Sequence, residues 1–399
     1  MIIKTDEYCL YITYDGLLDP LGSSQVLPYI ESLSDQGYKF ILFSFEKTDR
    51  SQKSIIELYK RLESRGIKWF YLPFKKRRFG YFIRIFKIWL LIKSKIKNIK
   101  VLLFHTRGIT TAILYFFCGL RCPLIYDIRA FAGEYIDCGR LSKKSIFSLF
   151  LMFFEKYLIN LSSGIVVLDQ SGADYIREKY SRIKGILKVI PTCTNTKLFS
   201  KKNKLTNSSR KNYYRLVFLG GARYPYRADL AIILVKKLLK NNILCKIDFI
   251  NERDHDYISD LCRKIGIPKK SYNIFSLPQR EIASHLINYD AGIIFNTTGF
   301  WRRMSSPTKL GEYLASGLNI ISLSGINLID TLSIKEPEIF EIFNENDFKN
   351  KISKARLLQI ENKLKDPYNS DKARKLAFEK FDLAIGNKQY KDLYDSLLV

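Results

Sequence analysis

The stretch SSPTKLGEYLASG, residues 305–317, says more about the fold than any other part of the 399-residue sequence. It comes shortly after the apolar run 291–295, which has the length and composition of a buried strand. Ser306 is a favourable helix N-cap, Pro307 suits the first helical turn, and Gly317 is of the type found just beyond a helix end. The segment therefore predicts a strand, a loop and a short helix, which together form one unit of an α/β protein.

The start of this predicted helix has the features of a phosphate-binding site. Backbone N–H groups at a helix N-terminus favour anions, and Lys309 adds a positive charge nearby. Glu312 lies further along, where a carboxylate can accept hydrogen bonds from both hydroxyls of a ribose. We expect a bound nucleotide to contact Ser305, Ser306, Thr308, Lys309 and Glu312. A capped amphipathic helix with an exposed glutamate and no ligand would have the same pattern.

Apolar runs of strand length recur on both sides of this motif, separated by helix-length segments. The N-terminal half has such runs at 9–13, 39–44, 99–104, 124–126 and 164–168, with a predicted helix at 25–36. A second series has strands at 216–219, 245–250, 291–295 and 319–322, with a helix at 228–241. Alternating strands and helices of this kind predict parallel sheets.

The polar stretch KKNKLTNSSRKN, residues 201–212, is the best candidate for a linker between the two series. We therefore expect an N-terminal domain at 1–200 and a C-terminal, nucleotide-binding domain at 213–370. Residues 371–399 have a helical pattern, and we expect them to pack back on the N-terminal domain.

Three motifs in this order resemble those of the glycosyltransferase family 4 enzymes. The stretch 11–28, YITYDGLLDPLGSSQVLP, resembles their opening strand and glycine loop. The stretch 189–199, VIPTCTNTKLF, is similar to their interdomain boundary, and 305–317 is similar to their acidic nucleotide-sugar motif. The resemblance covers nearly the whole chain and implies the GT-B fold, in which two Rossmann-like domains face each other across a cleft.

The resemblance implies a retaining transferase that takes a sugar from a UDP- or GDP-sugar to a glycan or lipid-linked acceptor. Cell-surface polysaccharides such as capsule or lipopolysaccharide would be its products. The nucleotide-sugar would be a co-substrate, and no metal or other cofactor is expected. A sugar-nucleotide epimerase, an inverting transferase or a catalytically degenerate binding subunit with the same fold are the alternatives.

Residue by residue, the resemblance implies that Glu312 binds the donor ribose. Met304 stands where these enzymes usually have a glutamate that contacts the sugar, and Tyr226 stands where they commonly have a lysine. Arg223 and Arg227 are close to Tyr226 in the sequence, and we expect them to supply the missing positive charge to the donor phosphates.

Two further segments at predicted strand ends are candidates for the N-terminal side of the site. Gly22 and Ser23 precede the helix 25–36, where a glycine allows close backbone approach to a donor phosphate or sugar. Asp127 and Arg129 follow the strand 124–126, and we expect them to act in catalysis, with Arg129 binding a phosphate. An ordinary turn and a structural Asp–Arg pair would explain the same residues.

The formal net charge is +27, which suits nucleic acid, an anionic membrane or phosphorylated small molecules as partners. The segment 75–100 has ten Lys or Arg, no acidic residue and apolar side chains at roughly helical spacing. This pattern is typical of helices that lie on anionic membranes, although a core helix with a basic outer side would share it. No RNA-binding motif accompanies it, so we expect no nucleic acid. The expected membrane contacts are Lys75, Lys76, Arg77, Arg78, Arg84, Lys87 and Trp89.

The start of the chain does not resemble a signal peptide, and no apolar run approaches the ~20 residues of a membrane span. We therefore expect a cytoplasmic protein, peripheral on the inner face of the cytoplasmic membrane. Asp254 and Asp256 have the spacing of a metal-binding pair, but the segment is more typical of a solvated turn than of a metal site.

Overall fold

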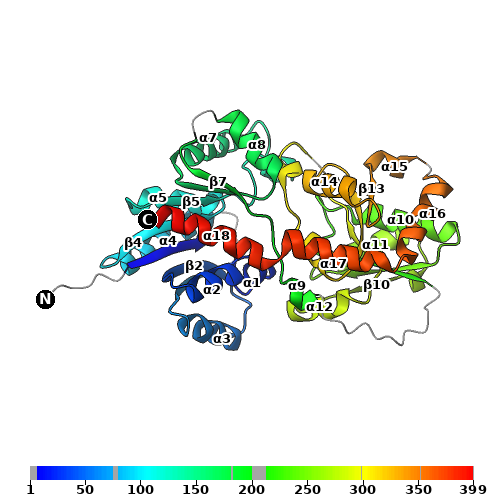
Figure 1. Ribbon diagram of the computed structural model, residues 1–399, viewed down its shortest axis with the longest axis horizontal. Helices are drawn as coiled ribbons and strands as arrows, with labels where there is room; N and C mark the ends of the chain where they lie inside the picture. Colours follow the sequence, from blue (N-terminus) through cyan, green and yellow to red (C-terminus); the bar gives the residue numbers. More distant parts are fainter. Residues whose placement is uncertain are drawn as a thin grey trace. The chain divides into compact units, whose positions relative to one another are not determined.

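A computed structural model describes residues 7–74, 80–180, 183–199, 213–297, 299–350 and 352–398 (Figure 1). The chain divides into two compact units. The first comprises residues 1–136, 140–191 and 383–399, and the second comprises 137–139 and 192–382. Each unit has its own parallel sheet with helices packed against it.

The first unit contains a seven-stranded sheet in the order β3-β2-β1-β4-β5-β6-β7, with every neighbouring pair parallel. Its strands are β1 (Glu7–Thr13), β2 (Phe40–Lys47), β3 (Lys68–Phe74), β4 (Lys100–Arg107), β5 (Leu124–Asp127), β6 (Gly164–Val167) and β7 (Ile186–Val189). Its helices are α1 (Pro20–Gln25), α2 (Leu27–Asp35), α3 (Gln52–Glu63), α4 (Gly80–Ile96), α5 (Ile109–Cys118), α6 (Glu134–Asp137), α7 (Ile146–Leu161), α8 (Gln170–Lys179) and α18 (Leu383–Leu398).

The second unit contains a six-stranded parallel sheet in the order β10-β9-β8-β11-β12-β13. Its strands are β8 (Tyr214–Leu219), β9 (Cys245–Ile250), β10 (Tyr272–Phe275), β11 (Ala291–Ile294), β12 (Asn319–Leu323) and β13 (Phe340–Phe343). Its helices are α9 (Thr196–Phe199), α10 (Ala228–Lys240), α11 (His255–Ile265), α12 (Gln279–Leu286), α13 (Thr308–Ala315), α14 (Asn327–Lys335), α15 (Glu345–Lys349), α16 (Lys354–Lys365) and α17 (Tyr368–Phe381), with 3-10 turns η1 (Lys269–Ser271) and η2 (Arg302–Met304).

Both sheets have the doubly wound strand order, in which the chain reverses direction across the sheet after the third strand. The reversal lies between β1 and β4 in the first unit and between β8 and β11 in the second. Ligands of such sheets bind outside the carboxyl ends of the strands at this point. The topology therefore places one candidate site in each unit.

The strands are apolar on both faces because helices cover both sides of each sheet. Phe40, Phe43 and Phe45 of β2 are fully buried, and so are Phe218 of β8 and Phe249 of β9. Continuous apolar runs are what a parallel sheet buried on both faces requires. This explains why the predicted strands fall on observed ones, with 245–250 matching β9 at both ends.

Two predicted helices are each divided in two. The predicted helix 25–36 corresponds to the end of α1 and to α2, which begins afresh at Leu27 with Pro28 in its first turn. Proline has no N–H to donate to the preceding turn, so a single continuous helix is disfavoured there. The predicted helix 371–398 corresponds to α17 and α18, which are separated at Asp382 by an extended backbone.

The division between the units differs from the expected one at residue 200. Residues 192–199 belong to the second unit because Thr194 N donates to Phe381 O at 2.7 Å and Phe199 packs in the core of that unit. The chain returns to the first unit at Leu383, not at residue 371. The predicted linker 201–212 lies outside the described residues.

Gly292 of β11 allows a close approach of α13 to the sheet of the second unit. A Cβ at this position would lie 2.1 Å from the ring of Tyr313, a fully buried side chain on α13. We expect Gly292→Ala to lower the free energy of unfolding by about 1–3 kcal/mol or more, because an added methyl group overfills the core. The midpoint of urea unfolding, read by circular dichroism, measures the effect.

Gly172→Ala is the matched control, since its Cβ would meet nothing closer than 3.4 Å. Equal unfolding midpoints for the two alanine variants would contradict the close packing of Tyr313 on β11.

Candidate functional site

The second-unit site is organised by α13, which is anchored to the last residue of β8. Tyr313 OH accepts a hydrogen bond from Leu219 N at 2.9 Å, and Lys309 Nζ donates to Leu219 O at 2.6 Å. Both side chains come from α13, and the glycine at 292 makes room for the Tyr313 ring. The helix is thereby fixed at the strand reversal between β8 and β11.

The beginning of α13 differs from the sequence prediction. The helix starts at Thr308 with Pro307 as its N-cap, and Ser306 is not the capping residue. The Ser306 hydroxyl instead lies 2.8 Å from Thr192 Oγ1 and accepts from Thr192 N at 3.2 Å. These bonds attach the segment after β7 to the start of the helix. The predicted C-terminal stop at Gly317 is confirmed, because Gly317 has φ +78° immediately after the last turn.

Lys309 and Glu312 lie one turn apart on α13, and both are buried. Burial lowers the pKa of Lys309 to about 8, while the nearby Glu312 opposes this shift. Burial raises the pKa of Glu312 to about 7, with the Lys309 charge acting in the opposite direction. No described residue donates a hydrogen bond to the Glu312 carboxylate, so its acceptor capacity is available to a ligand.

Arg302 also belongs to this site, although the sequence interpretation did not single it out. The positive charge of Arg302 adds to the lowering of the Lys309 pKa, after the larger effect of burial. Arg302 is buried, and its Nε donates to Thr297 O at 3.1 Å. The backbone N–H groups of Trp301 and Arg302 donate to Asp137 at 2.7 and 3.1 Å, which holds the turn η2 in place. The sequence feature that could have identified Arg302 is the pair of arginines, Arg302 and Arg303, just before the motif 305–317.

Met304 stands where the resemblance implies a glutamate that contacts the sugar. Its side chain is 4% exposed and packed in the protein interior. An apolar side chain there cannot accept a hydrogen bond from a sugar hydroxyl. Ser305, the next residue, caps η2 through its backbone N–H, which donates to Arg302 O at 3.1 Å. Thr308 is the first residue of α13.

The two arginines predicted to replace the phosphate-binding lysine already have carboxylate partners. Arg227 forms ion pairs with Asp229 at 2.7 Å and with Glu345. Arg223 pairs with Asp254 at 3.0 Å and is largely exposed. The charge of Arg227 is therefore balanced within the protein, whereas Lys309 lies over the rings of Tyr226 and Phe218.

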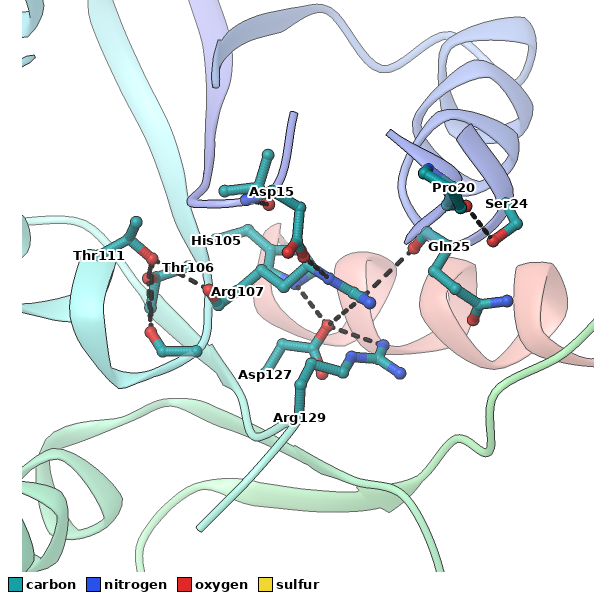
Figure 2. Close-up of polar contacts among 12 residues, drawn as sticks. Asp15, Pro20, Ser24, Gln25, His105, Thr106, Arg107, Thr111, Asp127 and Arg129 are labelled. Carbon is teal, nitrogen blue, oxygen red and sulfur yellow. Dashed lines mark hydrogen bonds and ion pairs between the residues drawn. The ribbon is translucent and has the colours of Figure 1, made fainter. Parts of the chain in front are cut away.

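The first-unit site centres on Asp127, the last residue of β5, which is completely buried (Figure 2). Its Oδ2 accepts hydrogen bonds from Arg129 at 2.8 Å and from Tyr390 OH of α18 at 2.9 Å. Arg107 Nη1 and His105 Nε2, both from β4, each lie 3.7 Å from the same oxygen. The predicted pair thus belongs to a larger buried network near the carboxyl ends of β4 and β5.

The charges of this network determine its protonation. Burial alone would raise the pKa of Asp127, but Arg129, followed by His105 and Arg107, holds it well below its usual range. Burial lowers the pKa of His105, against the opposing effect of Asp127. His105 is therefore neutral near pH 7, and its Nδ1 lies 2.8 Å from Tyr394 OH of α18.

Gly22 and Ser23 lie in the short helix α1, and the contacts that the structure gives for them are with other protein atoms. A Cβ at Gly22 would lie 2.0 Å from Gly16 O, so the glycine is required by the packing of two chain segments. Ser23 Oγ donates to Pro20 O at 3.2 Å. Figure 2 shows Gln25, the last residue of α1, near Arg107, whose Nη1 donates to Gln25 O at 3.2 Å.

The predicted membrane contacts are only partly described. Lys75, Lys76, Arg77 and Arg78 lie outside the described residues. On α4, Lys87 is exposed, Arg84 donates to Tyr14 OH at 3.1 Å, and Trp89 Nε1 donates to Phe117 O at 2.9 Å. In the described part of the chain, no helix is both long and apolar enough to cross a membrane.

Within the described ranges, no cluster of three or more His, Cys, Asp or Glu side chains is arranged to hold a metal ion. Asp254, the first member of the Asp254–Asp256 pair, accepts from Arg223 Nε at 3.0 Å and from Ala222 N at 3.2 Å.

Comparison with solved structures identifies the fold. Sucrose-phosphate synthase from Thermosynechococcus elongatus aligns with a TM-score of 0.72 at 13% identity, over 98% of this chain and 99% of that one. HepE from Anabaena, solved with UDP and glucose, aligns with a TM-score of 0.65 at 15% identity, over 98% of this chain and 100% of that one. The lipopolysaccharide outer core galactosyltransferase WaaB aligns with a TM-score of 0.65 at 11% identity, over 98% and 99%. No protein-family model and no curated protein matches the sequence. The chain has the GT-B fold, as predicted.

The raised pKa of Glu312 predicts a specific pH dependence of stability. A glutamate in the unfolded chain has a pKa of about 4.3. Glu312 in the folded protein has a pKa of about 7. The folded state therefore holds an extra proton in this window, and stability falls as the pH rises through it. We expect Glu312→Gln to gain up to about 3 kcal/mol relative to wild type between about pH 5 and about pH 8.

Urea unfolding of both proteins at the two pH values measures this difference. Glu379→Gln, which changes an exposed carboxylate of the same unit, should shift little between them. A Glu312→Gln variant whose stability relative to wild type is the same at both pH values would show that Glu312 titrates normally.

Proposed function

We propose that this protein is a glycosyltransferase that moves a sugar from a nucleotide-sugar donor to an acceptor hydroxyl. The observation that carries the proposal is the pair Lys309 and Glu312, buried on α13 at the strand reversal of the second unit. The pair lies in a fold that the chain shares with HepE, a protein solved with UDP and glucose. The resemblance to glycosyltransferase family 4 in three motifs supports the same function.

In the proposed donor complex, Glu312 accepts hydrogen bonds from the two ribose hydroxyls. Its carboxylate has no donor among the described residues and suits a pair of hydroxyls. The N–H groups at the start of α13, with Lys309 and Arg302, neutralise the diphosphate without a metal. A diphosphate beside Lys309 would raise the lowered pKa of that amine, so donor binding is coupled to its charged form.

The proposed mechanism is stabilisation of the leaving diphosphate and positioning of the acceptor hydroxyl. As in the family that the sequence resembles, the anomeric configuration would be retained, with a donor phosphate oxygen removing the acceptor proton. Met304 leaves the usual sugar contact without a carboxylate, so Ser305 and its neighbours are proposed to take over part of that contact.

We place the acceptor side at Asp127 and Arg129 of the first unit. Two nitrogens of Arg129, Nε and Nη1, have no hydrogen-bond partner among the described residues. An oxyanion of the acceptor, such as the phosphate of a lipid-linked glycan, is a suitable partner for a guanidinium held by Asp127. As in the family that the sequence resembles, we propose that such an acceptor belongs to cell-surface polysaccharide synthesis at the inner face of the cytoplasmic membrane.

Nucleotide binding is the first test. We expect one nucleotide series, UDP and UDP-sugars or GDP and GDP-sugars, to raise the thermal stability of the wild-type protein. A ligand at 100 times its dissociation constant should add about 2.7 kcal/mol. The shift should be lost in Glu312→Ala, which removes the ribose acceptor, and differential scanning fluorimetry measures it.

Glu379→Ala is the control for this test, because it removes an exposed carboxylate of the same unit. Wild-type protein that no nucleotide stabilises would contradict the transferase proposal and favour a degenerate GT-B binding subunit.

The stereochemistry of transfer tests the mechanism separately. We expect the donor that stabilises the protein to be cleaved slowly by water, releasing a sugar with the anomeric configuration of the donor. Proton NMR of the anomeric signal, read before mutarotation, identifies the configuration. An inverted sugar would refute retention while leaving the transferase intact, and an epimerised sugar would favour a sugar-nucleotide epimerase.

A further inference from the structure

Helix α7, the green helix labelled in Figure 1, exposes a stripe of large apolar side chains on the surface of the first unit. Ile146 is 85% exposed and Phe153 is 71% exposed. The side chains of the stripe lie along one side of the helix, because positions 146, 149 or 150, 153 and 157 follow one another at intervals of three or four residues. Its members, each half exposed or more, are Ile146, Leu149, Phe150, Phe153 and Tyr157.

The opposite side of α7 is partly polar, although it faces the protein interior. Ser148 is buried and its Oγ donates to Ser142 O at 2.7 Å. Glu155 is also buried, and its Oε1 accepts from Ala132 N at 2.9 Å and from Tyr126 OH at 3.2 Å. A helix on the surface of a water-soluble domain normally turns its charged residues outward and its aromatic residues inward. The inner side of α7 also buries the apolar Leu158 and Ile159, so it is the exposed aromatic and aliphatic residues of the outer side that point to an apolar environment there.

The stripe continues onto two neighbouring helices. Phe116 of α5 packs against Phe154 and Tyr157 of α7, with ring centroids 5.6 and 5.4 Å apart. Phe117, the next residue of α5, is 55% exposed, and its carbonyl accepts from Trp89 of α4. The outer side of α4 adds further exposed apolar side chains. We call this surface of α4, α5 and α7 the apolar face, with Ile83, Phe86, Leu90 and Phe117 joining the five residues of the stripe.

The charges beside the apolar face are almost all positive. Residues 80–121 contain no Asp or Glu, and residues 140–161 contain only Glu155, which is buried. Among the exposed cations of these described segments are Lys87, Lys93, Lys97, Lys143, Lys144 and Lys156. This combination is complementary to anionic lipid headgroups over an acyl interior. A second copy of the chain is a poorer occupant, because its own lysines would face these.

We propose that α7, with α5 and the outer side of α4, lies in the surface of an anionic bilayer, its apolar side chains below the headgroups. This inference locates the membrane contact of the proposed function, but it requires only lipid and does not depend on transferase activity. It moves the main apolar contact from the basic segment 75–100, where the sequence placed it, to α7. Lysines near the apolar face supply the attraction to anionic lipid.

Vesicle sedimentation tests the inference with the full-length protein. We expect the wild type to bind phosphatidylcholine vesicles that contain phosphatidylglycerol, and to bind pure phosphatidylcholine more weakly. Ile146→Ser combined with Phe153→Ser should weaken this binding about tenfold or more, because two large apolar side chains no longer leave water. The matched control is Ile334→Ser, which changes an 82% exposed apolar residue of the second unit and should bind like wild type.

Insertion is measured directly by Phe153→Trp. The emission of the introduced tryptophan should shift to the blue on vesicle binding and be quenched by brominated acyl chains. Ile334→Trp has the same native tryptophans, including Trp89 of α4, so any change in its emission is the background that the change in the Phe153→Trp variant must exceed. An unshifted and unquenched emission of the Phe153→Trp variant on bound vesicles would overturn the placement of α7 in the bilayer.

Two other results would also overturn the inference. Equal vesicle binding by wild type and by the Ile146→Ser, Phe153→Ser variant would show that the stripe does not contact lipid. A wild-type dimer in sedimentation without lipid that the same variant abolishes would assign the apolar face to a second copy. Nucleotide stabilisation of the variant reports separately on the transferase proposal, since that site lies in the second unit.

Discussion

One helix holds both the N–H and the C=O of Leu219, and the second-unit site depends on this contact. Tyr313 accepts from the backbone nitrogen and Lys309 donates to the carbonyl, so α13 is fixed to the end of β8. Because Lys309 is used in this way, it is buried, and Glu312 one turn later is buried with it. Their opposite pKa shifts follow from that shared burial. A ligand that supplies negative charge to Lys309 and hydroxyl donors to Glu312 would satisfy groups that the protein alone leaves only partly satisfied.

The first unit also buries ionisable side chains at its sheet, but with different residues. The carboxyl end of its strand β5 holds a buried carboxylate, Asp127, surrounded by two arginines, a histidine and Tyr390. The tyrosine comes from α18, the last helix of the chain, so the C-terminal segment is part of the interior of the first unit. Removing one partner from a buried charged network of this kind is costly because the remaining charge is left without compensation. The network thus keeps Arg129 in one orientation, and two of its nitrogens have no hydrogen-bond partner among the described residues.

Helix α7 presents a different kind of constraint. Large apolar side chains in water are unfavourable in proportion to the area that they expose, and the inner side of α7 buries Ser148 and Glu155 beside the apolar Leu158 and Ile159. Glu155 is accommodated only because Ala132 and Tyr126 donate to it, and burial raises its pKa to about 8. Such a helix is well suited to a position where its outer side leaves water.

The resemblance to a known family implied the GT-B fold, and the strands β3, β7, β10 and β13 were not predicted. The amino-acid sequence by itself determined the other nine strands and the end of α13 at Gly317. These features depend on local chemistry: strands buried on both faces need continuous apolar runs, and a left-handed helix end favours glycine. Tertiary structure alone decided which groups meet. Ser306 bonds to Thr192, 114 residues earlier in the sequence, instead of capping its own helix. Gly22 packs on Gly16, Arg227 is neutralised by two carboxylates, and the polar side of α7 turns inward. The Ser306–Thr192 and Arg227–Glu345 contacts leave no short-range signal in the sequence, because each joins two segments more than 100 residues apart.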